Sequence, residues 1–400
     1  MAADGCEMKS ALISGAGIAG PTLAYWLSRH GFRPTLVECA PKPRAGGYVI
    51  DFWGLGYDIA ERMGLLPELQ ACGYNVRELR FVDARGRRVG GFGVDVFRAL
   101  TNGRYVSLAR SDLAKSIFGK IDCPCLFDDT ITGLAQSAEG VRVSFAHGEE
   151  RSFDFVIGAD GLHSAVRRLI FGPERSFEKY LGYVAAAFEV GAYRPRDADV
   201  YVCHALPGRQ VARFALRGER TLFLFVFACG DVSGIGPNDL SAQKRTIHAA
   251  FDGAGWECPQ ILAALDSCAA LYFDPVSQIR MPEWSRHRVA LVGDAAFCPS
   301  LLAGQGSALA MLAAYVLAGE LAKSRDQPGR AFARYEARLR AFILEKQKGA
   351  EWFARSFAPR TRLGLVFRNQ VTKLFGIPGL AKFAMGPSLL DRLDLPSYES

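Results

Sequence analysis

The sequence predicts an α/β fold, in which a Rossmann-like nucleotide-binding domain is interleaved with an antiparallel-sheet domain and followed by C-terminal helices. Three observations predict it. A strand, a glycine turn, a helix and a second strand follow one another within residues 9–38. Two further apolar strands run into helices at residues 153–168 and 288–312, and four β-rich runs lie between residues 184 and 228. Alternating strands and helices favour a parallel sheet, whereas consecutive strands favour an antiparallel one.

The composition is that of a globular protein with a substantial core. Half of the 400 residues are hydrophobic and 22% are charged, and a chain of this length can bury a large core. The formal net charge is +7, but basic residues form a run only at Arg85, Arg87 and Arg88. This distribution suggests tolerance of anionic ligands and gives no sign of a nucleic-acid partner.

The first unit has the spacing of a dinucleotide-binding turn. Its strand, helix and second strand enclose Gly15, Gly17 and Gly20 in a G-x-G-x-x-G pattern. The first glycine permits the tight turn, the second lets the backbone approach a pyrophosphate, and the third lets the helix pack closely on the strands. Glu38 ends the second strand, where its carboxylate can accept hydrogen bonds from ribose hydroxyls.

Two later junctions extend the predicted ligand site. Residues 153–168 contain an apolar strand, the sequence GADG and a helix for which Ser164 is the expected N-cap. Residues 288–312 contain another apolar strand, the sequence GDAA and then GQG at the start of a long apolar helix. Ligands of open α/β sheets bind where strands end and helices begin. Three such junctions in one chain therefore indicate one extended ligand.

The segments between these junctions have a different pattern. Four β-rich runs separated by Arg, Pro and Gly turns predict an antiparallel sheet that serves as a substrate platform: 184–190, 199–206, 210–216 and 221–228. From Arg330 to Phe357 the pattern is helical, and the apolar stretch LFGIPGLAKFAMGPSLL follows. We expect this tail to cap the substrate pocket, with a membrane or partner contact as the alternative. The predicted domains are therefore nucleotide binding (1–70, 101–180 and 275–325), substrate binding (71–100 and 181–274) and a C-terminal helical cap (326–400).

The motifs occur together in the order of a known family. GAGIAG with Glu38, Arg44 followed by Gly46-Gly47, Arg110-Ser-Asp-Leu113, GADGLHSAVR, and GDAA followed by GQG resemble the para-hydroxybenzoate hydroxylase family of FAD-dependent monooxygenases. The resemblance covers residue 9 to about residue 325 and implies an FAD-binding domain of the GR2 type. The FAD contacts that it implies are Gly15, Gly17, Ala19, Gly20, Glu38, Arg44, Gly47, Arg110, Asp160, Gly161, Gly293, Asp294, Gly304, Gln305 and Gly306.

The resemblance also implies a role for each group of contacts. The first glycines would hold the pyrophosphate, Glu38 the adenosine ribose, and the two arginines would lie along FAD. The Asp160-Gly161 pair would serve both FAD and a transient nicotinamide cofactor, and Asp294 would bond the ribityl and pyrophosphate region. Residues 304–306 would face the flavin ring, where the N–H groups and positive dipole end of the following helix favour the negative charge of reduced flavin.

The activity implied is that of an FAD enzyme that consumes NADPH or NADH and hydroxylates an aromatic or polyketide-like small molecule with molecular oxygen, through a flavin C4a-hydroperoxide. No catalytic side chain is identified, because the flavin carries the chemistry. Residues 44–54 and the run GDAAFCPSLLAGQG are similar to tetracycline-inactivating and polyketide-tailoring hydroxylases. A reductase or dehydrogenase on the same scaffold and a non-enzymatic FAD-bound regulator stay open as alternatives. The five tryptophans form no W-x-W-x-I-P motif, which argues against a halogenase.

Four polar residues in the β-rich region and beside the third junction are candidate substrate contacts, with surface or core positions as the alternative: Tyr201, His204, Arg213 and Gln278. The reductant is expected to bind transiently, because no second G-x-G-x-x-G unit occurs in the sequence.

Cysteine usage indicates a reducing compartment. The ten cysteines show neither a CxxC pair nor a histidine at metal spacing, so we expect free thiols, no metal and a cytoplasmic protein. The first eight residues contain no hydrophobic run, so no signal peptide is expected. The apolar stretch 307–322 is shorter than the roughly 20 residues that a bilayer requires, which favours a core helix over a membrane contact. A monomer or a homodimer is expected.

Overall fold

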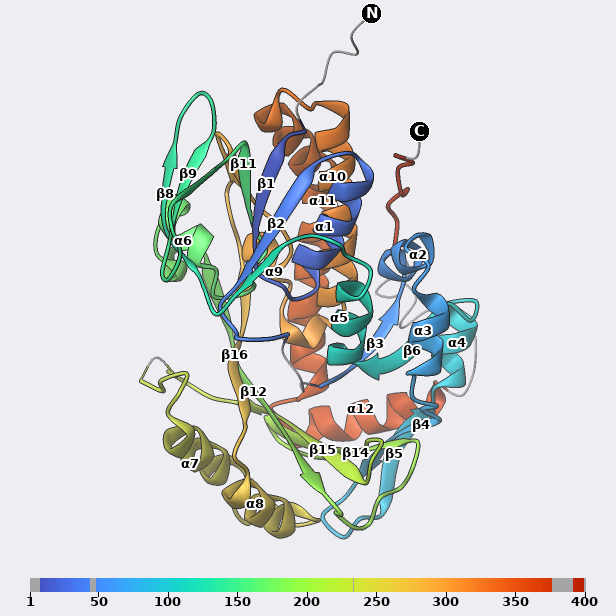
Figure 1. The fold of residues 1–400 in the computed structure, drawn as a ribbon. Coiled ribbons are helices and arrows are strands. Elements are labelled where there is room, and N and C mark those ends of the chain that lie inside the picture. Colours follow the sequence, from blue (N-terminus) through green and yellow to red (C-terminus); the bar gives the residue numbers. More distant parts are fainter. Residues whose placement is uncertain (1–7, 44–47, 233, 376–390, 399–400) are drawn as a thin grey trace, which may run out of the picture.

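The computed structural model describes residues 8–43, 48–232, 234–375 and 391–398. Figure 1 shows two lobes connected by the long strands β12 (Glu178–Gly191) and β16 (Tyr272–Ile279), with the N-terminal strands in the upper lobe. The predicted α/β class, with an antiparallel second sheet and helices after it, is confirmed by this arrangement.

A six-stranded sheet forms the centre of the upper lobe. Its strands lie in the order β17 (Ser285–Arg286), β18 (Val289–Leu291), β11 (Phe155–Gly158), β1 (Ser10–Ser14), β2 (Arg33–Glu38) and β7 (Cys125–Phe127). All neighbours are parallel except β17 and β18. Because β18, β11, β1 and β2 run in the same direction, the loops that follow them emerge at one edge of the sheet.

A seven-stranded sheet forms the lower lobe. Its strands lie in the order β16, β12, β15 (Arg220–Ala228), β14 (Arg209–Ala215), β13 (Val200–Leu206), β4 (Glu78–Val82) and β5 (Arg88–Gly93). Neighbouring strands are antiparallel except β13 and β4. Helices α7 (Leu240–Phe251) and α8 (Cys258–Ser267) pack on one face of this sheet through a cluster of buried phenylalanines, and α12 (Arg362–Leu374) lies on the other side (Figure 1).

Two smaller sheets and short helices complete the lobes. Strands β10 (Arg151–Phe153), β9 (Val141–Phe145) and β8 (Ile131–Gln136) form a three-stranded sheet, and β3 (Val49–Trp53) pairs with β6 (Tyr105–Ala109) in a two-stranded ribbon. The short helices are α2 (Leu55–Arg62), α3 (Leu66–Ala71), α4 (Asp95–Leu100), α5 (Arg110–Phe118), α6 (Ala165–Phe171), α9 (Asp294–Phe297), and the 3₁₀ turns Glu174–Ser176 and Leu301–Ala303.

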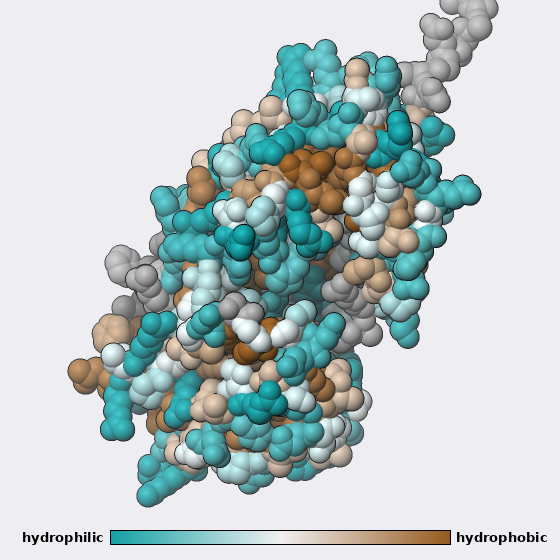
Figure 2. Space-filling model, turned by 90° about the vertical axis from the view of Figure 1, so that its left-hand side faces the viewer, coloured by the Kyte–Doolittle hydropathy of each residue, from teal (hydrophilic) through white to brown (hydrophobic). Residues whose placement is uncertain are grey.

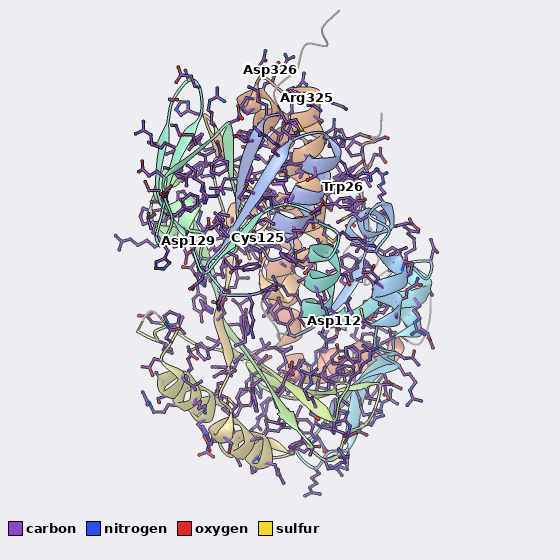
Figure 3. The ribbon with its side chains drawn as sticks, viewed as in Figure 1. Trp26, Asp112, Cys125, Asp129, Arg325 and Asp326 are labelled. Atoms are coloured by element: carbon purple, nitrogen blue, oxygen red, sulfur yellow. The ribbon has the colours of Figure 1, made fainter. Side chains whose placement is uncertain are left out.

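The apolar helix α10 (Gly306–Lys323) is the centre of the upper core. It packs between α1 (Ala19–Arg29), α2 and α11 (Pro328–Phe357). Trp26 of α1, labelled in Figure 3, meets Tyr315 of α10 edge-on, with ring centroids 4.9 Å apart. By length and composition α10 could span a membrane, but 72% of it is buried inside the protein. This extensive burial explains why most residues of α10 are apolar, as predicted for a core helix.

The outer surface is mainly polar on the face shown in Figure 2, where hydrophilic side chains surround a smaller hydrophobic patch in the upper half. The final described segment, residues 391–398, returns to the upper lobe, where Tyr398 is buried against α10 and donates a 2.6 Å hydrogen bond to Glu320. Most of the apolar tail that we predicted as a cap, residues 376–390, lies outside the described residues.

Candidate active site

A large cavity lies between the edge of the six-stranded sheet and the inner face of the seven-stranded sheet. Its volume is about 2090 Å³, roughly twice the upper end of ordinary small-molecule pockets, ~1000 Å³. Its lining is drawn from both lobes, from the β3–β6 ribbon and from α12. The cavity therefore has room for an elongated ligand together with a second, smaller molecule.

The three predicted junctions open into this single cavity. Gly15 and Gly17 follow β1, Asp160 and Gly161 follow β11, and the 304–306 segment comes after β18 and α9; members of all three line the cavity. Their convergence follows from the parallel order of the strands, because the carboxyl ends of β1, β11 and β18 are side by side.

The first turn is shaped so that only glycine fits at its start. Gly15 has φ +106°, and a Cβ placed there would lie 2.5 Å from the carbonyl oxygen of Ala159 in the neighbouring loop. Gly17 is different, since a Cβ there would meet nothing closer than Arg110 Nη2 at 3.9 Å. Helix α1 begins directly afterwards without a side-chain cap, so its N–H groups and positive dipole end face the cavity.

Glu38 closes the same turn from the adjacent strand. Its Oε2 accepts a 2.8 Å hydrogen bond from the Ala16 N–H, and its Oε1 accepts one of 3.0 Å from the Ala40 N–H. The side chain is 8% exposed and lines the cavity. A buried carboxylate at this position can also accept from hydroxyl groups of a ligand.

The loop after β11 is held by its own aspartate. The Asp160 Oδ1 accepts a 2.5 Å hydrogen bond from the Ser164 hydroxyl, and Oδ2 accepts one of 3.1 Å from the Val166 N–H. Ser164 is the N-cap of α6, as predicted, accepting from the Arg167 N–H. Asp160 therefore anchors the start of α6 while Gly161, with φ +78°, turns the chain along the cavity.

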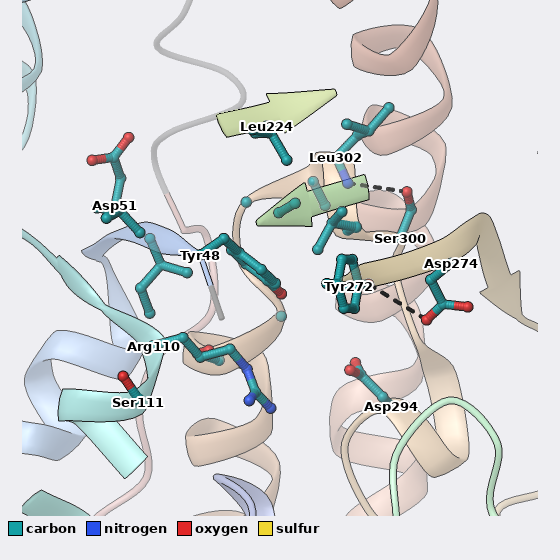
Figure 4. A pocket seen from close by; sticks show the side chains of 18 of the residues that line it. Tyr48, Asp51, Arg110, Ser111, Leu224, Tyr272, Asp274, Asp294, Ser300 and Leu302 are labelled. Carbon is teal, nitrogen blue, oxygen red and sulfur yellow. Dashed lines mark hydrogen bonds between the residues drawn. The ribbon is translucent and has the colours of Figure 1, made fainter. Parts of the chain in front are cut away.

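An arginine and an aspartate, Arg110 and Asp294, line the cavity near α10. Figure 4 shows Arg110 and Tyr48 on one side of the pocket and Asp294 and Tyr272 on the other. Burial raises the pKa of the Asp294 carboxyl, while the positive charge of Arg110 opposes that rise. Burial also raises the pKa of Tyr48, to about 12, so its hydroxyl keeps its proton. The start of α10 lies beside this group, because a Cβ at Gly306 would be 3.8 Å from Asp294 Oδ1.

Most of the predicted cofactor contacts that the structure describes line the cavity. They are Gly15, Gly17, Ala19, Glu38, Arg110, Asp160, Gly161, Asp294, Gly304 and Gly306. Three others lie behind the lining: Gly20 packs against the backbone of Gly15, Gly293 against Ala19 and Ala310, and the buried Gln305 precedes α10. Arg44 and Gly47 lie outside the described residues.

Of the four predicted substrate contacts, the structure brings only Tyr201 to the cavity. Its ring stacks on Phe214 with centroids 4.2 Å apart.

The other three side chains do not line this cavity and have structural partners elsewhere, which agrees with the alternative of surface or core positions. His204 is bonded to the carbonyl oxygens of Val82 and Ala254 at 3.1 and 2.9 Å. Arg213 is paired with Asp197 at 2.7 Å. Gln278 donates to the carbonyl oxygens of Pro299 and Gln347 at 3.0 and 2.7 Å.

Several cavity residues were missed from the sequence, among them Tyr48, Asp51, Tyr272 and Arg368. The sequence does contain an indication for Asp51, because it is the lone charged residue in the apolar strand VIDFW. A charge in such a strand requires a partner or a function. The described residues contain no cluster of His, Cys, Asp and Glu that could hold a metal ion.

Comparison with known proteins gives consistent results. The model of an FAD binding domain matches residues 111–343. A flavin-dependent monooxygenase from an unknown prokaryotic organism is 35% identical over 360 residues, which cover 87% of this chain and 90% of that protein. Another flavin-dependent monooxygenase, from Legionella longbeachae, is 34% identical over 402 residues, which cover 97% of this chain and 98% of that protein. The crystal structure of tetracycline destructase Tet(55) is 32% identical, with a TM-score of 0.83 and coverage of 98% of this chain and 99% of that one.

Proposed function

This chain belongs to the FAD-dependent monooxygenases of the para-hydroxybenzoate hydroxylase type, and from that premise we propose that it hydroxylates an aromatic or polyketide-like small molecule at the expense of NADPH or NADH. The observation that carries the proposal is the single cavity into which three strand-to-helix loops open. Its volume accommodates the cofactor and leaves an apolar compartment for a substrate.

The residues around the cavity fit FAD. Gly15 and Gly17 leave the backbone bare at the uncapped start of α1, which suits a pyrophosphate. Arg110 reaches toward the same turn, as its Nη2 would lie 3.9 Å from a Cβ on Gly17, and would add a positive charge there. Glu38 would accept the ribose hydroxyls of the adenosine half, next to the Ala16 N–H that it already binds.

The other end of the cavity suits the flavin ring. Gly304 adopts the left-handed conformation, and Gln305, at the start of α10, makes no side-chain cap. The free N–H groups of α10 would therefore meet the ring edge that becomes negative on reduction. When bound, FAD accepts electrons from the nicotinamide and uses them to activate oxygen for transfer to the substrate.

The protein's own contribution to hydroxylation is placement and exclusion of water. Beyond the proposed flavin position the cavity is lined mainly by apolar side chains of the lower sheet and α4, with Tyr201 among them. Such a wall holds a flat aromatic ring by stacking and keeps water away from reactive intermediates. The sequence contains one G-x-G-x-x-G unit, which we assign to FAD. The nicotinamide reductant would therefore bind transiently, entering from the open side of the cavity and leaving once the flavin is reduced.

The test combines cofactor content, reductant use and product mass. Purified protein loaded with FAD is incubated with NADPH or NADH and a panel of phenols, hydroxyanthraquinones and tetracyclines, with FAD-stripped protein as the control. We expect substrate-stimulated consumption of the reductant and a product one oxygen atom heavier, labelled by ¹⁸O₂. Protein that binds no flavin, or that oxidises the reductant without oxygenating any compound of the panel, contradicts the proposal.

Tetracycline inactivation is a second candidate, favoured by the 32% identity to Tet(55) over almost the whole chain. The same panel separates it from tailoring of other aromatics, because only this candidate requires oxygenation of the tetracyclines. A reductase on the same scaffold would give products without added oxygen. We also propose a cytoplasmic location, supported by the free state of all nine cysteines in the described residues.

A further inference from the structure

The β3–β6 ribbon brings a carboxyl group into a cavity that is lined largely by apolar side chains. Apolar side chains that line the cavity include Val76, Leu79, Phe81, Phe92, Phe97 and Leu224, and Arg368 of α12 lies over the Phe81 ring, 3.9 Å from its centroid. Asp51 and Tyr105 line the cavity from the ribbon itself. A carboxyl in such surroundings is costly unless its oxygens accept hydrogen bonds, so the partners of Asp51 decide what it can do.

One carboxylate oxygen of Asp51 is fully engaged within the ribbon. Asp51 and Ser107 are cross-strand neighbours in the β3–β6 pair. The hydroxyls of both Tyr105, at 2.5 Å, and Ser107 donate to Asp51 Oδ1, and these two hydroxyls also contact each other at 2.7 Å. The Tyr105 ring is fixed by parallel stacking on Phe97, with centroids 6.0 Å apart. Oδ1 is therefore held in place by two donors.

The other oxygen, Oδ2, belongs to a side chain that lines the cavity and is not engaged by these two hydroxyls. Oδ2 accepts no hydrogen bond from any residue that the structure describes. It is also not one of the fully buried polar atoms that lack a partner, so it is accessible to a small molecule. The Asp51 side chain is partly exposed although it lies deep in the protein, because it borders the cavity. Burial raises the pKa of Asp51, and the hydrogen bonds from Ser107 and Tyr105 oppose that rise. An additional donor at Oδ2 would favour the ionised form further.

Asp51 also lies close to the proposed flavin position. Trp53 is two residues further along β3 and therefore on the same face of the strand. Its ring would be 3.8 Å from a Cβ at Gly304, in the loop that would meet the flavin. Figure 4 shows Asp51 on the same side of the pocket as Tyr48 and Arg110, opposite Tyr272 and Asp294. A substrate in reach of the flavin is thus in reach of the β3–β6 ribbon.

We propose that Asp51 Oδ2 accepts a hydrogen bond from a phenolic or enolic hydroxyl of the substrate, so that the enzyme selects hydroxyl-bearing rings over their ethers and fixes their orientation in the cavity. An ionised carboxyl is an acceptor only, and both donors near it are already committed to Oδ1. A hydroxyl satisfies Oδ2, whereas an ether oxygen in the same place leaves Oδ2 unpaired. Tyr105 and Ser107 are positioning residues, since they act through Asp51. This inference rests on the proposed function, because it places the substrate beside the flavin.

A binding measurement without turnover tests the proposal. FAD-loaded protein without NAD(P)H is titrated at pH 8 with 2-naphthol and with 2-methoxynaphthalene, and Kd is read from the change in the flavin spectrum and from naphthalene fluorescence. A hydrogen bond to a charged group contributes at least about tenfold in affinity. We therefore expect wild type to bind the naphthol at least about tenfold more tightly than the ether.

The matched variants are Asp51→Asn and Asp95→Asn. Both remove one carboxylate, but the Asp95 side chain is 92% exposed on α4. We expect Asp51→Asn to abolish or reverse the preference, since its amide can present a donor to the ether oxygen, while FAD content stays at the wild-type level. Asp95→Asn should keep the wild-type ratio, and Tyr105→Phe should reduce it while Asp51 is retained.

The outcomes separate this proposal from the proposed function. Equal affinity for the two probes in wild type, including failure of both to bind, overturns the role of Asp51 while leaving FAD-dependent oxygenation intact. An unchanged preference in Asp51→Asn overturns it as well and would mean that Asp51 only joins β3 to β6. Loss of FAD from wild-type protein would instead contradict the proposed function.

Discussion

Substitution of two neighbouring glycines separates folding from cofactor binding. At Gly15, alanine would be strained by φ +106° and its Cβ would lie 2.5 Å from the Ala159 carbonyl oxygen. A non-glycine residue in such a conformation costs of the order of 1–3 kcal/mol, and the contact with backbone adds to that cost. At Gly17, a Cβ has nothing nearer than Arg110 Nη2 at 3.9 Å. We expect Gly17→Ala to change the stability of the FAD-free protein by less than about 0.5 kcal/mol.

FAD affinity should behave differently from stability in this pair. Gly17 lines the cavity, so the methyl group added by Gly17→Ala would occupy the space in which we propose that the pyrophosphate approaches the backbone. Loss of one charged hydrogen bond costs about 1.5–3 kcal/mol, which corresponds to roughly 10- to 100-fold weaker binding. Chemical unfolding of FAD-stripped protein and titration with FAD measure the two effects separately. Gly17→Ala protein that binds FAD as tightly as wild type, or that unfolds as readily as Gly15→Ala, would refute the reasoning.

Substitutions at three further positions test other parts of the structure. Glu38→Ala should weaken FAD binding about tenfold but leave FMN binding unchanged, because FMN lacks the adenosine ribose; equal losses for both flavins would contradict its placement. The carboxylates of Asp274, which has the larger effect, and Glu174 raise the pKa of His163 from 6.5 to about 10. The contribution of protonated His163 to the free energy of unfolding is therefore complete below pH 6.5 and is lost as the pH rises to about 10. His163→Gln should flatten the unfolding free energy across that interval, by less than about 1 kcal/mol because the side chain is half-exposed. Tyr398→Ala should lower the unfolding free energy by about 3–5 kcal/mol. Tyr398→Phe should lower it by about 1–3 kcal/mol, because only the hydrogen bond to Glu320 is lost. Thermal unfolding curves of both variants that coincide with that of wild type would show that the 391–398 segment is not docked in solution.

The part of the cavity that we propose for the nucleotide could be predicted from sequence because its determinants are local. Gly15, Gly17 and Glu38 lie within one strand–turn–helix–strand unit, and the parallel sheet then brings the later junctions to the same edge. The position of the loop at Asp294 follows from the direction of β18, the strand that precedes it. Backbone geometry, more than side-chain packing, defines the positions of these loops, and the spacing of the glycines in the sequence indicates that geometry.

The part of the cavity that we propose for the substrate could not be predicted in the same way, because it depends on which face of each strand turns inward. Side chains alternate along a strand, and in β13 it is Tyr201 and Cys203 that line the cavity. His204 must then point to the opposite face, where it meets carbonyl oxygens of Val82 and Ala254. Alternation alone shows that Tyr201 and His204 cannot share a face, but the choice between them is made by the packing of α7 and α8 on the outer side. The same dependence hides Asp51, whose inward orientation follows from the pairing of β3 with β6, about 55 residues later in the chain.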